Sequence, residues 1–68
     1  MTPEEETRAV DDVTRRLTTR FPHVSQQDVA AVVGTAHASF DGSPIRDFVP
    51  LLVERTAREH LTTSLALP

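Results

Sequence analysis

Histidine is the side chain with the widest chemical range in this sequence, and it occurs at His23, His37 and His60. An imidazole can transfer protons near neutral pH or bind a metal ion. None of the three belongs to a recognised metal-binding spacing such as His-Glu-x-x-His. The chain also has no cysteine, which excludes disulfides, thiolate metal ligands and thiol catalysis. We therefore predict no catalytic residue, no metal and no cofactor, and we predict that the chain is not an enzyme.

Serine and glycine do not add a chemistry of their own. Ser25 and Ser43 each precede a predicted helix, where a serine side chain caps the first turn. No histidine and aspartate are arranged around either serine as a catalytic triad requires. With only two glycines, the chain has no glycine-rich loop for phosphate. The two serines are therefore interpreted as helix caps.

The charge balance argues against two classes of partner. The formal net charge is −3, and all seven basic residues are arginine. An acidic chain is a poor candidate for binding nucleic acid or an anionic membrane. No apolar run approaches the ~20 residues that a membrane-spanning helix needs. The acidic start, "MTPEEETR", is the opposite of a signal peptide, so we expect a cytoplasmic protein.

Three predicted helices, over residues 3–20, 26–41 and 44–62, must position these side chains, and a tail follows over 63–68. Thr2 and Glu5 form a capping box before the first helix, Ser25 caps the second and Ser43 the third. Gly42 suits a left-handed position after the second helix. Each segment carries an apolar stripe at helical spacing. The sequence thus predicts one all-α domain, a compact three-helix bundle.

Pro50 lies inside the third apolar segment, "PIRDFVPLLVERTAREHL". A proline in a helix interior removes a backbone donor and disfavours helical geometry in the preceding residue. Two alternatives follow. Either the helix is kinked near Pro50, or a short first turn precedes a main helix that starts near Val49.

The helical stripes define a predicted core. Its members are Val10, Val13, Leu17, Phe21, Val29, Val32, Val33, Ala36, Phe40, Ile45, Phe48, Val49 and Leu52. With Ile45 as the angular origin, the apolar arc of the third helix extends well beyond this core, to roughly 220°, where one core-facing stripe needs little over 100°. The surplus consists of Val53, Ala57 and Leu61, with His60 inside the arc as a candidate pH-sensitive residue.

We interpret that surplus as an interface with a second chain. A chain of 68 residues without disulfides has a small core, which pairing would supplement. Ala30, Gly34 and Ala38 form a second stripe, of small residues, which either suits close helix approach or is an alanine-rich exposed face that tolerates one glycine. The expected partner is a copy of the same chain or another protein. The competing interpretation is that the third helix is sandwiched between the first two, which would use the same arc without a partner.

Two stretches carry a family resemblance. "VAAVVGTAHASF" and "PIRDFVPLLVERTAREHL" resemble the three-helix-bundle dimerization domain, found as a short standalone protein and as the N-terminal extension of arsenate reductases similar to low-molecular-weight phosphatases. The resemblance covers about residues 10–62, and "LVERTARE" is its most specific part. It implies a helical bundle that pairs with a copy of itself. The chain lacks a reductase domain and cysteine, so no reductase or phosphatase chemistry is implied.

Two further functions remain as alternatives. "FPHVSQQDVAAVV" with a later "LL" is similar to the CUE type of ubiquitin-binding domain, and this similarity implies that Phe21, Pro22, Leu51 and Leu52 contact the partner. Three short helices are also the frame of helix-turn-helix DNA-binding domains. The available cations for that role are Arg46, Arg55 and Arg58, which are interleaved with Asp47, Glu54 and Glu59. Nucleic acid is therefore an unlikely partner.

Overall fold

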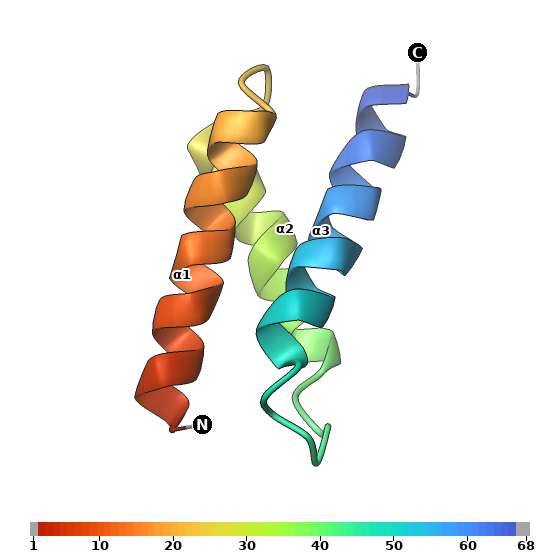
Figure 1. The fold of residues 1–68 in the computed structure, drawn as a ribbon. Helices are drawn as coiled ribbons and strands as arrows, with labels where there is room; N and C mark the ends of the chain where they lie inside the picture. The colour runs from red at the N-terminus through yellow and green to blue at the C-terminus, as the bar shows by residue number, and fades with distance from the viewer. Residues whose placement is uncertain (1, 67–68) are drawn as a thin grey trace.

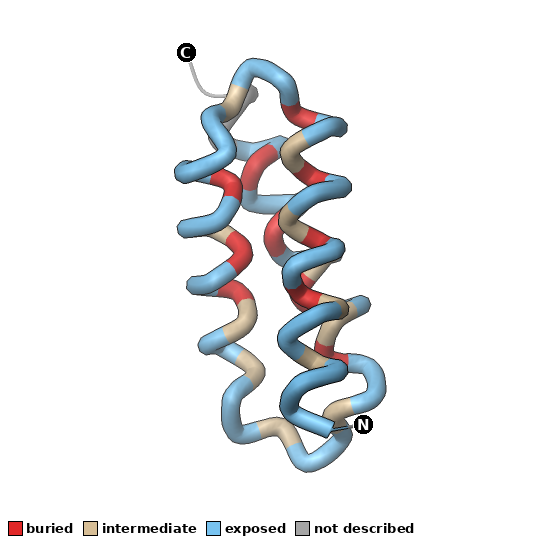
Figure 2. The backbone as a smooth tube through the Cα atoms, turned by 90° about the vertical axis from the view of Figure 1, so that its left-hand side faces the viewer, coloured by how far each residue is buried: buried red, intermediate tan, exposed pale blue. Residues whose placement is uncertain are grey.

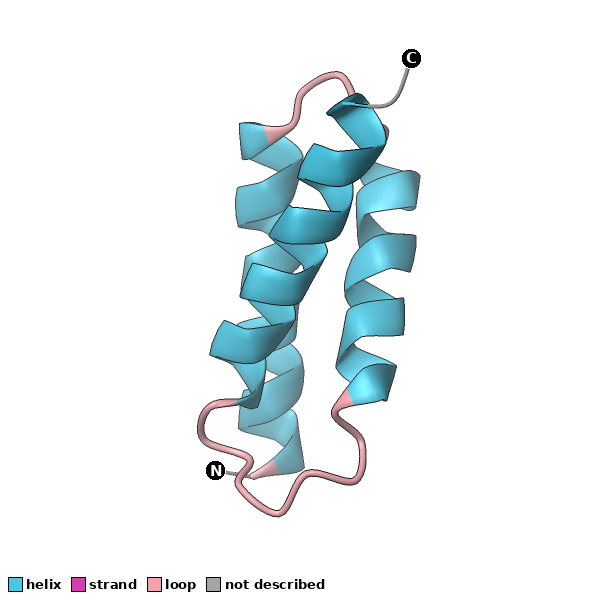
Figure 3. Ribbon diagram, turned by 90° about the vertical axis from the view of Figure 1, so that its right-hand side faces the viewer, coloured by secondary structure: helices cyan, strands magenta, loops and turns pink. Residues whose placement is uncertain are grey.

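The computed structural model describes residues 2–66 and contains three helices, α1 (Pro3–Arg20), α2 (Gln26–Ser39) and α3 (Val49–Ala66). The helices run up, down and up, and each packs against the other two (Figure 1). The predicted all-α three-helix bundle is confirmed. The loop over residues 40–48 lies at the same end of the bundle as the N-terminus of α1 (Figure 3). The last residues of the predicted tail, 67–68, lie outside the described part.

The limits of α1 agree with the prediction because residues next to them set the start and the end. The Thr2 side chain accepts a hydrogen bond from the Glu5 amide at 3.2 Å, and the Glu5 carboxylate accepts one from the Thr2 amide at 3.3 Å. This capping box satisfies two of the amides that a helix start leaves without partners. At the other end, the Phe21 amide donates to the carbonyl of Leu17, and Pro22 follows.

The start of α2 is as predicted, but its end is not. Ser25 accepts a hydrogen bond from the Asp28 amide at 3.1 Å. The helix ends at Ser39, and no described residue has a positive φ, so Gly42 does not form the predicted left-handed cap. Instead, the Phe40 and Asp41 amides donate to the carbonyls three residues earlier, those of His37 and Ala38. These 3₁₀-type hydrogen bonds close the last turn.

The start of α3 at Val49 decides between the two alternatives for Pro50. Residues 44–48 are not helical, so the helix restarts, and the predicted cap at Ser43 is wrong. A helix from residue 44 would place Pro50 in its interior, at a cost of ~3 kcal/mol. In the first turn, a missing amide donor costs little because those amides lack intrahelical partners.

The core lies along the axis of the bundle, where the buried positions of all three helices face inward (Figure 2). Its members are Val10, Val13, Leu17, Phe21, Val29, Val33, Ala36, Val49, Val53, Ala57 and Leu61. Eight of these residues belong to the predicted core. In α3 the core column is Val49, Val53, Ala57 and Leu61, spaced by four residues.

Five predicted core residues are not fully buried. Ile45 and Phe48 are 58% and 59% exposed, while Val32, Phe40 and Leu52 are partly buried. For Ile45, Phe48 and Leu52 the error has one cause. Helical angles counted from Ile45 are meaningless when residues 45–48 are not helical, and the restart at Val49 resets which side of α3 faces inward.

Candidate interaction site

Charged residues are distributed unevenly over the three helices. In α1 they recur in every turn, from Glu4 to Arg20. In contrast, residues 29–39 of α2 and the following Phe40 include no Asp, Glu, Lys or Arg. Most residues of this stretch that do not belong to the core have small side chains and are exposed. A solvent-facing helix normally carries charges on its outer side, so α2 is the unusual surface of the molecule.

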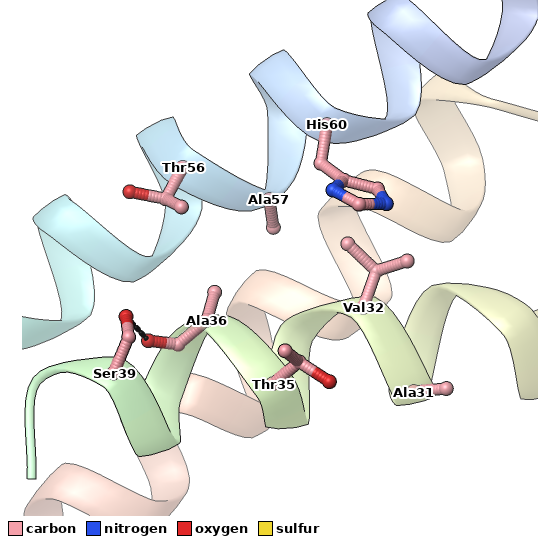
Figure 4. Close-up of a pocket in the computed structure, with 8 residues that line it drawn as sticks. All are labelled: Ala31, Val32, Thr35, Ala36, Ser39, Thr56, Ala57 and His60. Atoms are coloured by element: carbon pink, nitrogen blue, oxygen red, sulfur yellow. Dashed lines mark hydrogen bonds between the residues drawn. The ribbon is translucent and has the colours of Figure 1, made fainter.

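An apolar groove lies between α2 and α3 (Figure 4). It has a volume of about 300 Å³ and is lined by Ala31, Val32, Thr35, Ala36, Ser39, Thr56, Ala57 and His60. The side chains of Ala36 and Ala57 point toward each other between the helices, and Val32 points toward His60. The Ser39 hydroxyl donates to the Ala36 carbonyl at 2.6 Å, so it is already engaged. The groove holds no convergent acid–base pair and is suited to packing.

A column of α3 residues leads from the groove toward the 40–48 loop. Phe48, Leu52, Thr56 and His60 follow one another at intervals of four residues, which places them on one side of the helix. Phe48 directly precedes α3, and its carbonyl accepts the first-turn hydrogen bond from Leu52. We call this column, together with the exposed small residues of α2, the neutral face. Its members are Ala30, Ala31, Gly34, Thr35, Ala38, Ser39, Phe48, Leu52, Thr56 and His60.

The predicted interface residues divide into two groups. Val53 and Ala57 are 0% exposed and Leu61 is 2% exposed within one chain, so their interpretation as surplus to the monomer is wrong. They fill the space between α1 and α2, as the competing interpretation proposed. His60, Ala30, Gly34 and Ala38 are exposed and lie on the neutral face. The structure therefore leaves this second group free to meet a partner.

A cluster of charged side chains joins the end of α2 and the following loop to α1. Arg46 donates to both carboxylate oxygens of Glu6, from Nε to Oε1 at 2.8 Å and from Nη2 to Oε2 at 2.7 Å. His37 Nε2 lies 2.7 Å from the same Oε2 atom. The Arg46 Nη1 atom also donates to the Phe40 carbonyl at 2.8 Å. We call this set of contacts the Glu6–Arg46 clamp.

The clamp was not predicted, because its two principal residues are 40 positions apart in the chain. One local signal was present. Arg46 is the first arginine after Arg20, and it follows the C-terminus of α2, where a cation interacts favourably with the terminal carbonyls. That signal indicates a cap for α2. It does not identify Glu6.

The clamp makes the stability of the fold depend on pH. Hydrogen bonds from Arg46 and then His37 lower the pKa of the Glu6 carboxyl from its usual 4.5 to about 2. A lowered pKa in the folded state stabilises the fold above the unfolded pKa, and this stabilisation is lost as pH falls through the folded value. We expect wild type to melt higher than Glu6→Gln above pH 5, and this difference to shrink between pH ~4.5 and ~2.

Thermal melting followed by circular dichroism at several pH values checks this expectation. Glu4→Gln is the matched control, since it removes an exposed carboxylate from the same helical turn without touching the clamp. A difference between wild type and Glu6→Gln that stays constant down to pH 2 would contradict the assignment.

The ubiquitin-binding alternative is not supported by the arrangement of its residues. The 21–25 turn and the start of α3 lie at opposite ends of the bundle (Figure 1). Phe21 is also buried, whereas Leu51 is 65% exposed. The residues that the CUE similarity implies as one contact therefore do not meet.

The cations of the DNA-binding alternative are mostly neutralised. Arg46 is held by Glu6, and Arg55 forms an ion pair with Glu59 at 3.3 Å. Within residues 2–66, no group of three or more His, Asp or Glu side chains could hold a metal ion. Nor does that part of the chain contain a helix with the length and apolar character needed to cross a membrane.

Comparisons with models of protein families, with curated proteins and with solved structures find no match to this chain. The resemblance to the three-helix-bundle dimerization domain therefore stays a prediction from the residues quoted above.

Proposed function

We propose that this chain is a non-catalytic protein–protein interaction module that associates with a copy of itself through the neutral face. The observation that carries the proposal is the absence of charge from an exposed surface that contains a groove and ends at an exposed phenylalanine. Exposed apolar surface bordered by polar residues is typical of protein interaction sites.

Charge favours a second copy as the partner. Each chain carries a formal net charge of −3, so two copies repel each other unless they meet where neither is charged. The neutral face meets that condition, because an uncharged surface can face its own copy without placing like charges together. Most soluble oligomers are also symmetric homodimers, in which the same patch is used by both chains.

The dimensions of the bundle set how much of its surface such a contact must use. The molecule measures 38 Å by 18 Å across its broad side, which corresponds to roughly 700 Å² in projection. A stable interface buries about 800 Å² of accessible surface on each partner. A specific contact would therefore have to cover nearly the whole of one broad side of the bundle.

Gly34 gives the proposal a specific residue. Glycine in a helix interior costs about 1 kcal/mol relative to alanine. A Cβ atom built on Gly34 would meet nothing within 4 Å, so packing inside the chain gives no reason for a glycine here. A second helix that approaches α2 closely would give one.

Two substitutions at this position separate folding from association. Gly34→Ala should raise the free energy of unfolding of the monomer by up to about 1 kcal/mol. Gly34→Arg should also leave the monomer folded, since the position is open, but should abolish association by placing a long charged side chain in the contact. The measurements are thermal melting at low concentration and molar mass at high concentration. Thr19→Arg, which adds the same charge to an exposed position of α1, should leave association unchanged.

A Gly34→Arg chain that associates as tightly as wild type would contradict the use of the neutral face. Equal weakening by Thr19→Arg would show that the effect does not depend on the position of the substitution, and would also contradict the use of the neutral face.

A further inference from the structure

No residue of the 40–48 loop is fully buried, and only Phe40, at its start, packs against the core. From Phe40 to Phe48 each residue is exposed or only partly buried. Its two largest apolar side chains besides Phe40, those of Ile45 and Phe48, are mostly in solvent. Since buried apolar surface is the main force that fixes a loop, this segment needs another source of order.

Arg46 supplies that order through one guanidinium group. Two of its nitrogens bind both oxygens of Glu6 on α1, and Nη1 donates to the carbonyls of Phe40, Asp41 and Ser43 at 2.8, 3.2 and 3.3 Å. Its own carbonyl accepts the Val49 amide at 3.0 Å, where α3 begins. A single residue therefore connects α1, the end of α2 and the start of α3. Bidentate bonds between arginine and a carboxylate fix direction as well as distance.

We propose that Glu6 and Arg46 are positioning residues that hold Phe48 at the edge of the neutral face in the orientation that the second copy contacts. This inference rests on the proposed function. Phe48 follows Arg46 by two residues and directly precedes α3. Its carbonyl stays bonded to the Leu52 amide, so release of the clamp loosens the loop that leads into Phe48 on one side only. The clamp itself touches no partner, and its effect on association acts through Phe48.

Hydrogen exchange and association, measured on the full chain, test the two parts of this inference separately. In Glu6→Gln, the Ser43 and Val49 amides, which bond within the loop and to Arg46, should exchange about tenfold faster than in wild type. The Val33 amide in the middle of α2 exchanges through global unfolding, so its exchange should accelerate only by the factor that the lower global stability of Glu6→Gln predicts. Association of Glu6→Gln, measured by sedimentation equilibrium, should weaken by about tenfold.

The matched control is Arg16→Gln. It removes another two-bond contact between α1 and a later carboxylate, that of Glu54, in which both bonds are 3.0 Å long. That contact does not involve the loop, so exchange of the Ser43 amide and the strength of association should both stay near wild type.

A double-mutant comparison distinguishes positioning from general destabilisation. In a Phe48→Ser background, Glu6→Gln should weaken association no further, because the side chain that the clamp positions is absent. An equal loss in both backgrounds would overturn the inference. So would faster loop exchange with unchanged association, or unchanged exchange. A wild-type chain that stays monomeric would overturn the proposed function as well, whereas the other outcomes overturn the inference alone.

Discussion

Replacing Ala57 by glutamate is expected to unfold the chain. Ala57 is 0% exposed and lies where α3 meets the other helices, so the substitution forces a charge and four further side-chain heavy atoms between packed helices, beside an apolar groove that offers no Arg or Lys partner for the charge. An unpaired buried charge costs at least about 3 kcal/mol, and a core in a chain of this size supplies only about 3–5 kcal/mol in total. Circular dichroism at 25 °C should show loss of most helical signal.

Thr62→Glu is the control for this experiment, because it adds the same charge to an exposed position of the same helix. It should melt close to wild type. A folded Ala57→Glu monomer would mean that the column of Val53, Ala57 and Leu61 faces outward after all, and would restore its first interpretation as an interface.

Leu17→Ala is the second substitution with a large expected effect. Leu17 is 1% exposed and is among the largest fully buried side chains of the bundle. Truncating a buried leucine to alanine costs about 2–5 kcal/mol through lost apolar burial and the cavity left behind. We expect a fall of the melting temperature by more than ten degrees, or an unfolded chain at 37 °C, as measured by calorimetry or circular dichroism.

Leu51→Ala makes the same chemical change at a site that is 65% exposed. Its effect on the monomer should stay within about 0.5 kcal/mol. If the two substitutions cost the same, the burial pattern that distinguishes α1 from the outer side of α3 would be incorrect.

The parts of the fold that were predictable are those set by neighbouring residues. Thr2 and Glu5 cap α1 by contacts within one turn, and Ser25 does the same for α2. Such caps can be identified from a few residues. The end of α2 could not, because its last turn is closed by the Phe40 and Asp41 amides and the carbonyl of the capping Phe40 accepts from Arg46 in the next loop, without a left-handed glycine.

The uncertain start of α3 also made the prediction of its buried side uncertain. Pro50 allowed either a kink or a restart, and the choice changes which residues face inward. Once α3 begins at Val49, Val53 and Ala57 fall in the core, while Ile45 and Phe48 remain in solvent. The predicted interface and the predicted core of this segment therefore exchanged places for one physical reason.

The candidate site was predictable only where exposure follows from a single helix. Ala30, Gly34 and Ala38 lie opposite the apolar stripe of α2, and they are exposed as that spacing predicted. The groove needs α2 and α3 at a known separation, and the clamp joins Glu6 to a residue far along the chain. Helical periodicity carries no information on either.

Sedimentation equilibrium of the wild-type chain from micromolar to millimolar concentration tests the proposed self-association most directly. If the neutral face binds its own copy, the molar mass should rise with concentration from 7.5 kDa toward twice that value and level off there. A mass that stays at 7.5 kDa up to millimolar concentration would contradict self-association.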